Sequence, residues 1–276
     1  MSTYLITGSS GFIGSHLVKT LELEKDTRIF MSSGDISNSN WGPVFSDLDY
    51  IYHLAGTTDT RDTSDIEVYR NNINCFLSVL NLAMKTNAKL IYASSAQIYG
   101  NAGKQITAYS VSKLAIEKIA EFYFDKLKIV GLRLSNVFGP NEFQKGKMAS
   151  MITRWAHQIK TTGKPIAFKN SQAVRDFIYV KDVVSALLFA REKESGFYDV
   201  GSGKPVSFEV ILDLVRKILK HEGEIEWIDN PYKDAYQIFT QAKLNWGFQP
   251  RWELKDAIEY YLLNYPNFYT DDFKIP

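Results

Sequence analysis

Residues 3–14 read Thr-Tyr-Leu-Ile-Thr-Gly-Ser-Ser-Gly-Phe-Ile-Gly, an apolar run that leads into a glycine-rich segment. The run predicts a buried strand over 3–7, and the spacing that follows predicts a helix over 15–23. Glycines at 8, 11 and 14 allow a tight turn, close approach of a pyrophosphate and a helix N-terminus aimed at it. The stretch therefore predicts a dinucleotide site made by Gly8, Ser10, Gly11, Phe12, Ile13 and Gly14.

Strand and helix patterns alternate along the chain around this stretch. Apolar runs predict buried strands at 28–31, 50–56, 89–93, 128–134 and 197–200. Helical apolar spacing predicts helices at 67–85, 109–126 and 181–191. This alternation predicts an α/β fold with a Rossmann-type, doubly wound parallel sheet.

The alternation stops beyond Pro140. Residues 146–171 read as a helix and a short strand, and helices at 208–221 and 254–263 flank a strand at 224–228. We therefore expect a dinucleotide-binding domain at 1–145, completed by about 175–200. A smaller C-terminal α/β substrate lobe is expected from 146–174 and 201–276.

Composition excludes several function classes. A net charge of +1 gives no reason to expect nucleic acid or an anionic membrane as a partner. The longest apolar run, 183–190, is too short to cross a bilayer. One cysteine, Cys75, suits a reducing compartment, so a cytoplasmic location is expected. The histidines, at 16, 53, 157 and 221, have no metal-ligand spacing, so no metal is expected.

The end of the second predicted strand bears on the choice of dinucleotide. Ser32 and Ser33 stand where an acidic residue would hold the ribose hydroxyls of NAD. Serines leave room for a 2′-phosphate, which favours NADP over NAD, although no arginine follows. Asp35, with Ile36, either flanks the adenine or is a solvated turn carboxylate. The small-residue turn Leu54-Ala55-Gly56 is expected to lie under the cofactor.

Tyr109 and Lys113 are the residues on which catalysis is expected to depend. On a helix they are i and i+4 and project from one face. An ammonium near a phenol lowers the pKa of a group that otherwise ionises at about 10. They are therefore either an acid/base pair or two surface residues four apart. A serine at the end of the strand at 89–93, Ser94 or Ser95, can meet them at one substrate oxygen.

Four motifs stand out along the chain: Gly8-x-x-Gly11-x-x-Gly14, Tyr52-His-Leu-Ala-Gly56, Ser94-Ser-Ala-Gln-Ile-Tyr-Gly100 and Tyr109-x-x-x-Lys113. Together they resemble the extended short-chain dehydrogenase/reductase family, over about residues 3–265. The family contains nucleotide-sugar epimerases, dehydratases and reductases. The resemblance implies that Tyr109 moves the hydroxyl proton, that Lys113 tunes it and binds the nicotinamide ribose, and that Ser95 holds the reacting oxygen.

The resemblance also implies further binding residues. Asn71 matches an asparagine near the cofactor, and Asn136 matches one that contacts the nucleotide sugar. Arg175 matches an arginine that binds the substrate diphosphate, the alternative being a surface ion pair with Asp176. The helices at 67–85 and 110–127 match those of the family's four-helix dimer interface, so a homodimer is expected.

Three stretches, 92–96, 136–150 and 236–244, narrow the resemblance to the ADP-L-glycero-D-manno-heptose 6-epimerases. That group implies that Lys145 is a second acid/base opposite Tyr109, the alternatives being a solvated lysine or a phosphate contact. Lys147 of the same loop is expected to bind substrate. Tyr236, Phe168 and Ser171 are expected to line the nucleotide pocket.

The expected activity is therefore an NAD(P)-dependent epimerase of a nucleotide-diphosphate sugar, which removes a hydride, leaves a ketone and returns the hydride. The alternatives are a reductase or dehydratase of a nucleotide keto sugar and, outside enzymes, a dinucleotide-binding sensor. The sequence departs from the family pattern in three ways. The acid after the second strand is missing, the connection from that strand toward His53 is short, and only eight residues separate Gly100 from Tyr109. These departures affect the prediction of the sugar substrate more than the prediction of the reaction type.

Overall fold

The computed structural model describes residues 1–32, 47–58, 66–101, 107–169, 171–231 and 237–265, with Ile36, Ser37, Trp41 and Phe45. Two predicted site residues, Asp35 and Tyr236, lie outside these described residues. No helix in the described ranges is both long enough and apolar enough to cross a membrane.

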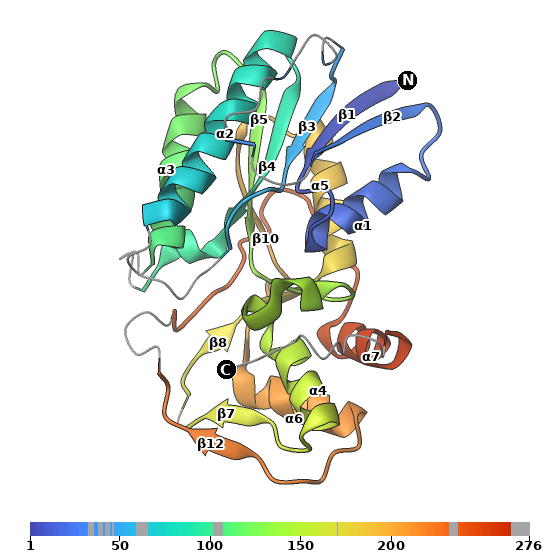
Figure 1. Ribbon diagram of the computed structural model, residues 1–276, viewed down its shortest axis with the longest axis vertical. Helices are drawn as coiled ribbons and strands as arrows, with labels where there is room; N and C mark the ends of the chain where they lie inside the picture. Colours follow the sequence, from blue (N-terminus) through green and yellow to red (C-terminus); the bar gives the residue numbers. More distant parts are fainter. Residues whose placement is uncertain are drawn as a thin grey trace.

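A six-stranded sheet is the framework of the molecule (Figure 1). The strand order is β10-β5-β4-β3-β1-β2, and all neighbouring pairs are parallel. The strands are β1 (Ser2–Thr7), β2 (Thr27–Ser32), β3 (Tyr50–His53), β4 (Lys89–Ser95), β5 (Ile129–Leu134) and β10 (Gly196–Val200). The predicted α/β fold with a Rossmann-type parallel sheet is confirmed, although the strand predicted over 50–56 ends at His53.

Strand β1 lies inside the sheet because it pairs with β2 on one side and β3 on the other. Its side chains alternate between two cores: Tyr4 and Ile6 pack into one, and Leu5 into the other. The chain turns outward to β2 and then crosses to β3, so the direction of winding reverses beside β1. In open parallel sheets such a reversal leaves a crevice at the carboxyl ends of the strands, where ligands bind.

Helices cover both faces of the sheet (Figure 1). Helices α1 (Phe12–Leu21) and α5 (Val180–Phe189) pack together on one face, and α2 (Ile66–Thr86) and α3 (Ala108–Phe122) on the other. Helix α1 begins three residues earlier than predicted, because Gly11 is already its N-cap. The glycine turn therefore leads directly into the helix.

A smaller lobe lies beyond the carboxyl ends of the strands, in the lower half of Figure 1. Strands β7 and β12 pair in it, as do β8 and β11, and a short pair, β6 with β9, joins it to the sheet. The remaining elements are η2 (Ala96–Tyr99), β6 (Asn136–Phe138), η3 (Glu142–Met148), α4 (Met151–Thr161), β7 (Ile166–Phe168), β8 (Val174–Arg175), β9 (Phe177–Tyr179), η4 (Ala190–Glu192), β11 (Val206–Ser207), α6 (Phe208–Ile218), β12 (Glu226–Ile228) and α7 (Leu254–Asn264).

Candidate active site

A cavity of about 510 Å³ lies between the carboxyl ends of the strands and the smaller lobe. Its walls come from the segments after β1 and β3, from the ends of β4 and β5, and from η3, α4 and β8. The predicted site residues that line it are Gly8, Gly11, Phe12, Ile13, Gly14, Leu54, Ala55, Gly56, Ser95, Tyr109, Lys113, Asn136, Lys145, Lys147, Phe168 and Arg175. The fold thus gathers cofactor, catalytic and substrate candidates in one place.

The glycine turn fits a dinucleotide because its shape excludes side chains. Gly8 has a φ of +69°, and a Cβ there would lie 2.7 Å from Ala55 N. A Cβ on Gly14 would lie 2.1 Å from Gly8 O. Gly8 N donates to Ser32 O at 2.9 Å, which ties the turn to the end of β2. The turn therefore leaves backbone and the N-terminus of α1 facing the cavity, as a pyrophosphate requires.

The second wall of the cofactor site is held by Asn72. Thr57 N donates to Asn72 Oδ1 at 2.8 Å, and Asn72 Nδ2 donates to Thr57 O at 3.1 Å and to Ser112 Oγ at 3.0 Å. A Cβ on Gly56 would lie 3.0 Å from Asn72 Oδ1. Asn71, the predicted residue, is exposed, and neither Asn71 nor Asn72 lines the cavity, so a contact of Asn71 with the cofactor stays a prediction.

Tyr109 and Ser95 both line the cavity, and each is positioned by a helix cap. Tyr109 lies in the first turn of α3, whose start is fixed by Thr107, which accepts a hydrogen bond from Ser110 N at 3.1 Å. Ser95 ends β4 and caps η2, because its Oγ accepts from Gln97 N at 3.1 Å. The side chains of Ser95 and Tyr109 are hydrogen-bonded to each other. Two separate caps thus aim both hydroxyls at the same point.

Lys113 lies one turn after Tyr109 and is buried. Its Nζ is 5.7 Å from the centre of the Tyr109 ring and donates to Ala93 O at 2.8 Å. Burial lowers the pKa of Lys113 to about 8, and Cys75 and Glu117 act in the opposite direction. The predicted i, i+4 pair is therefore not two surface residues.

The predicted lowering of the phenol pKa is wrong for the protein as it stands. Burial raises the pKa of Tyr109, and the hydrogen bond with Ser95 only partly offsets this. The reason is that a phenolate loses more by leaving water than it gains from the neighbouring groups. Tyr109 is therefore a phenol at neutral pH, able to donate a proton to an oxygen beside it.

Lys145 reaches the cavity from the loop η3. Its Nζ lies 3.7 Å from Glu142 Oε1 and 5.8 Å from the centre of the Phe12 ring. Glu142 is completely buried and accepts from Ser150 N at 2.6 Å, Ser150 Oγ at 2.8 Å and Thr153 Oγ1 at 2.6 Å. The Glu142 carboxylate thus anchors η3 to the first turn of α4 and directs Lys145 toward α1, the helix that follows the glycine turn.

Arg175 lies on β8 with its guanidinium 5.8 Å from the centre of the Phe208 ring, and it is buried. The carboxylate of its neighbour Asp176 is engaged elsewhere, since it accepts from Ser202 N, Gly203 N and Ala242 N at 2.7–2.9 Å. Asp176 therefore fixes the backbone next to Arg175, and the Arg175 side chain lines the cavity.

Other predicted residues do not line the cavity. Ser10 is exposed, Ile36 is buried in the core between the sheet and α2, and Ser32 contributes its carbonyl to the glycine turn. Ser171 lines a separate small cavity with Phe168 and Trp227.

Sequence reasoning missed several residues that do line the cavity. They include Gln97, Ser135, Arg154, Gln237 and Thr240, whereas Ser94, the named alternative to Ser95, also lines the cavity. Gln237 Nε2 donates to Ala96 O at 3.2 Å and to Gly100 O at 3.3 Å, so it joins the smaller lobe to the loop after Ser95. It follows Tyr236 directly in the stretch 236–244, which was the one available signal.

The electrostatics of the cavity favour an anionic ligand. Its described lining contains the cations Lys113, Lys145, Lys147, Arg154 and Arg175 and no carboxylate. Within the described residues no group of three His, Cys, Asp or Glu side chains could hold a metal ion.

Several proteins of known structure share this architecture. ADP-L-glycero-D-manno-heptose-6-epimerase of Helicobacter pylori is 28% identical with a TM-score of 0.83, and 96% of each chain is covered. UDP-N-acetylglucosamine 4-epimerase from Methanobrevibacter ruminantium, in complex with UDP-N-acetylmuramic acid, is 21% identical with a TM-score of 0.85, covering 95% of this chain and 97% of that one. UDP-glucose 4-epimerase of Thermus thermophilus, in complex with NAD, is 22% identical with a TM-score of 0.81, covering 96% and 99%.

At 21–22% identity the last two comparisons establish the fold alone. The sequence profile of the NAD dependent epimerase/dehydratase family, however, matches residues 4–201, which include the glycine turn, Ser95, Tyr109, Lys113 and Arg175. The chain therefore belongs to the NAD dependent epimerase/dehydratase family, enzymes of the extended short-chain dehydrogenase/reductase type.

Proposed function

We propose that the protein is an epimerase of a nucleotide-diphosphate sugar that uses NAD or NADP. The observation that carries the proposal is the single cavity in which Ser95, Tyr109 and Lys113 face the glycine turn. The described lining of the cavity has five cationic side chains and no carboxylate, which supports a diphosphate substrate. A diphosphate group carries about two negative charges that such cations can pair with.

The residues of the chain divide the chemistry between them. Bound NAD or NADP supplies the acceptor and donor of hydride at the reacting carbon. Ser95 Oγ holds the substrate oxygen, and Tyr109 exchanges the hydroxyl proton with it. The Lys113 ammonium stabilises the phenolate that forms when Tyr109 gives up its own proton.

Lys145 is the proposed second proton-transfer group. An epimerase must return the hydride to the other face of the ketone, so a second acid on the other side of the substrate assists inversion. Lys145 reaches the cavity from η3, whereas Tyr109 reaches it from the first turn of α3. Arg175 is the proposed diphosphate ligand, because its planar fork pairs two phosphate oxygens, with Lys147 and Asn136 beside the substrate.

The dinucleotide is NAD or NADP. The end of β2 at Ser32, where an acidic residue would bind the ribose of NAD, favours NADP. A second copy of the chain is the other proposed partner, since α2 and α3 carry the exposed apolar residues Ile66, Leu77, Met84, Val111 and Phe122. A cytoplasmic location stays a prediction from the single cysteine.

Mass spectrometry of the purified protein for bound dinucleotide, followed by NMR of nucleotide sugars incubated with it, tests the proposal. An epimerase converts one sugar to its epimer with no net consumption of cofactor. Stoichiometric oxidation of NADPH by a keto sugar would instead identify a reductase. Dinucleotide binding without turnover of any nucleotide sugar would favour a sensor.

A further inference from the structure

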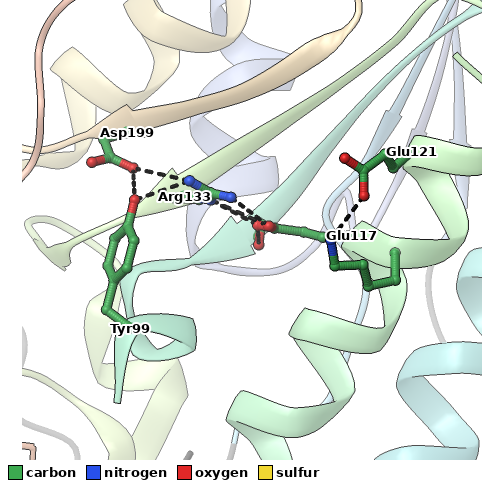
Figure 2. A network of polar contacts seen from close by, with 7 residues as sticks. Tyr99, Glu117, Glu121, Arg133 and Asp199 are labelled. Atoms are coloured by element: carbon green, nitrogen blue, oxygen red, sulfur yellow. Dashed lines mark hydrogen bonds and ion pairs between the residues drawn. The ribbon is translucent and has the colours of Figure 1, made fainter. Parts of the chain in front are cut away.

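Arg133 and Glu117 form an ion pair in which the carboxylate is buried and the guanidinium is partly exposed (Figure 2). Glu117 follows Lys113 by one turn of α3 and is 2% exposed. It accepts from Arg133 Nε at 3.0 Å and Nη2 at 2.7 Å, and from Ser94 Oγ at 2.6 Å. Because Ser94 precedes Ser95 in β4, the carboxylate ties the catalytic helix to the strand that carries the catalytic serine.

The network continues from Arg133 into the rest of the site. Arg133 Nη1 donates to Tyr99 OH at 3.0 Å, and Tyr99 OH donates to Asp199 Oδ1 at 2.6 Å. Tyr99 belongs to η2, the turn that Ser95 caps, and Figure 2 shows the guanidinium between it and Glu117. Asp199 Oδ2 in turn accepts from Lys243 N at 2.9 Å. The Arg133 guanidinium thus contacts Tyr99, which follows Ser95 in the chain, and Glu117, which holds Ser94 just before it.

Folding alone gives no reason for such a pair. A buried ion pair adds little net stability compared with apolar residues of the same volume, because both charges lose their hydration. What a bidentate pair supplies is a fixed orientation and a fixed charge. Both properties matter here, since Ser95 needs orientation and Lys113 needs a nearby anion.

We propose that Glu117 is a positioning residue for the reaction. It fixes Ser94, and hence Ser95, to α3, and it keeps a negative charge one turn from the Lys113 ammonium. The inference rests on the proposed function of the cavity, and it adds Glu117, which does not line that cavity.

The charge effect has a definite sign. The titratable groups around Lys113 are Cys75 of α2, His53 of β3, and Tyr109 and Glu117 of α3. Burial lowers the pKa of His53 to about 3, so this imidazole is neutral at pH 7. Burial lowers the pKa of Lys113 to about 8, and Cys75 and Glu117 oppose the change. Removal of the Glu117 charge therefore lowers the pKa of Lys113 further.

Glu117→Gln tests the proposal, with Glu121→Gln as the matched control. Glu121 lies one turn further along α3 and makes an exposed ion pair with Lys118 at 2.9 Å (Figure 2). Carbon-13 NMR of labelled lysine side chains follows the Lys113 titration, assigned with Lys113→Met. We expect Glu117→Gln to lower that midpoint by about one pH unit and kcat roughly tenfold, with KM changed less than about threefold. Glu121→Gln should have the wild-type Lys113 midpoint, kcat and KM.

Ser94→Ala separates the two effects, because it removes the hydroxyl contact and keeps the charge. We expect a lower kcat with an unchanged Lys113 midpoint, and the variant also serves if Glu117→Gln does not fold. If folded Glu117→Gln keeps the wild-type Lys113 midpoint, the proposed charge effect on Lys113 is refuted. If Ser94→Ala keeps the wild-type kcat, the proposed positioning of Ser95 through Ser94 is refuted. The NMR titration needs no substrate, so it still tests the charge effect if wild type turns over no nucleotide sugar and the proposed function fails.

Discussion

At the scale of single residues, the proposed function requires Tyr109 to donate and accept a proton although it is buried. Burial raises the pKa of its phenol, so the proton is held until a substrate oxygen and the Lys113 ammonium share the charge. Ser95 fixes the direction of the hydroxyl. The residue is therefore suited to exchange a proton within a bound complex and not with solvent.

Tyr109→Phe is expected to lower turnover of the nucleotide sugar at least about 100-fold, because the acid/base is removed. Binding of dinucleotide should persist, since the glycine turn is untouched. NMR rates and fluorescence titration measure the two effects. The control is Tyr198→Phe, whose hydroxyl donates to Glu194 O outside the cavity. Retained turnover in Tyr109→Phe would contradict the assignment.

The pH dependence of turnover is expected to follow Lys113. Its folded pKa is about 8, below the ordinary value of 10.5, so the ammonium is present below pH 8 and lost as the pH rises through 8. Because the ammonium stabilises the phenolate, kcat should fall on the alkaline side of pH 8. Measurement between about pH 6 and pH 10 checks this, and a rate that stays constant to pH 10 would exclude the role.

At the scale of elements, the glycine turn and the first turn of α1 act as one unit. We expect Gly14→Ala to weaken dinucleotide binding at least about tenfold, because its Cβ would meet Gly8 O at 2.1 Å and force the backbone apart. Calorimetric titration with NAD and NADP measures the loss. Gly196→Ala at the start of β10 is the control, because its Cβ meets only the Tyr198 side chain, at 3.3 Å. Equal affinity in the two variants would refute the expectation.

The loop η3 depends on Glu142 in the same way. Glu142→Ala leaves three donors, two on Ser150 and one on Thr153, without their buried acceptor. We expect a loss of about 3 kcal/mol in the free energy of unfolding. Urea unfolding measures it against Glu222→Ala, an exposed carboxylate expected to change stability by less than about 0.5 kcal/mol. Equal stability of the two variants would show that the loop is held by other contacts.

The sequence predicted secondary-structure elements well where the hydrophobic periodicity was strong. It predicted site residues poorly where tertiary packing determines which side chains reach the cavity. The apolar runs located β1, β4 and β5 to within about two residues, because strands buried on both faces read as continuous hydrophobic segments. Helical spacing found α2 but not the side on which Asn71 and Asn72 fall, since neighbours differ by about 100° around the axis. The role of Gln237 depends on two carbonyls about 140 residues away, and no local pattern encodes such a contact.

At the scale of the whole molecule, the outer surface of α2 and α3 carries apolar side chains that the sheet does not cover. Phe122 is 72% exposed and Leu77 43% exposed. A second copy of the chain packing on this surface would bury both residues. Light scattering should therefore find twice the 31.5-kDa mass of one chain.

The double change Leu77→Glu with Phe122→Glu should give a monomer, because it places charges in the interface. Phe239→Glu, a change at a 51% exposed aromatic residue of the C-terminal part, should leave the mass unchanged. A monomeric wild type would refute the dimer without affecting the chemistry of the cavity.

The edge strand β10 has a consequence for how such proteins can be recombined. It is supplied by Gly196–Val200, after the chain has already formed η3, α4 and β7 of the smaller lobe. A single crossover between two relatives therefore cannot exchange one lobe and keep the other. A chimera that transplants sugar preference needs paired junctions on either side of β8 to β10, and a chain truncated before residue 196 would leave β5 as the unpaired edge of the sheet.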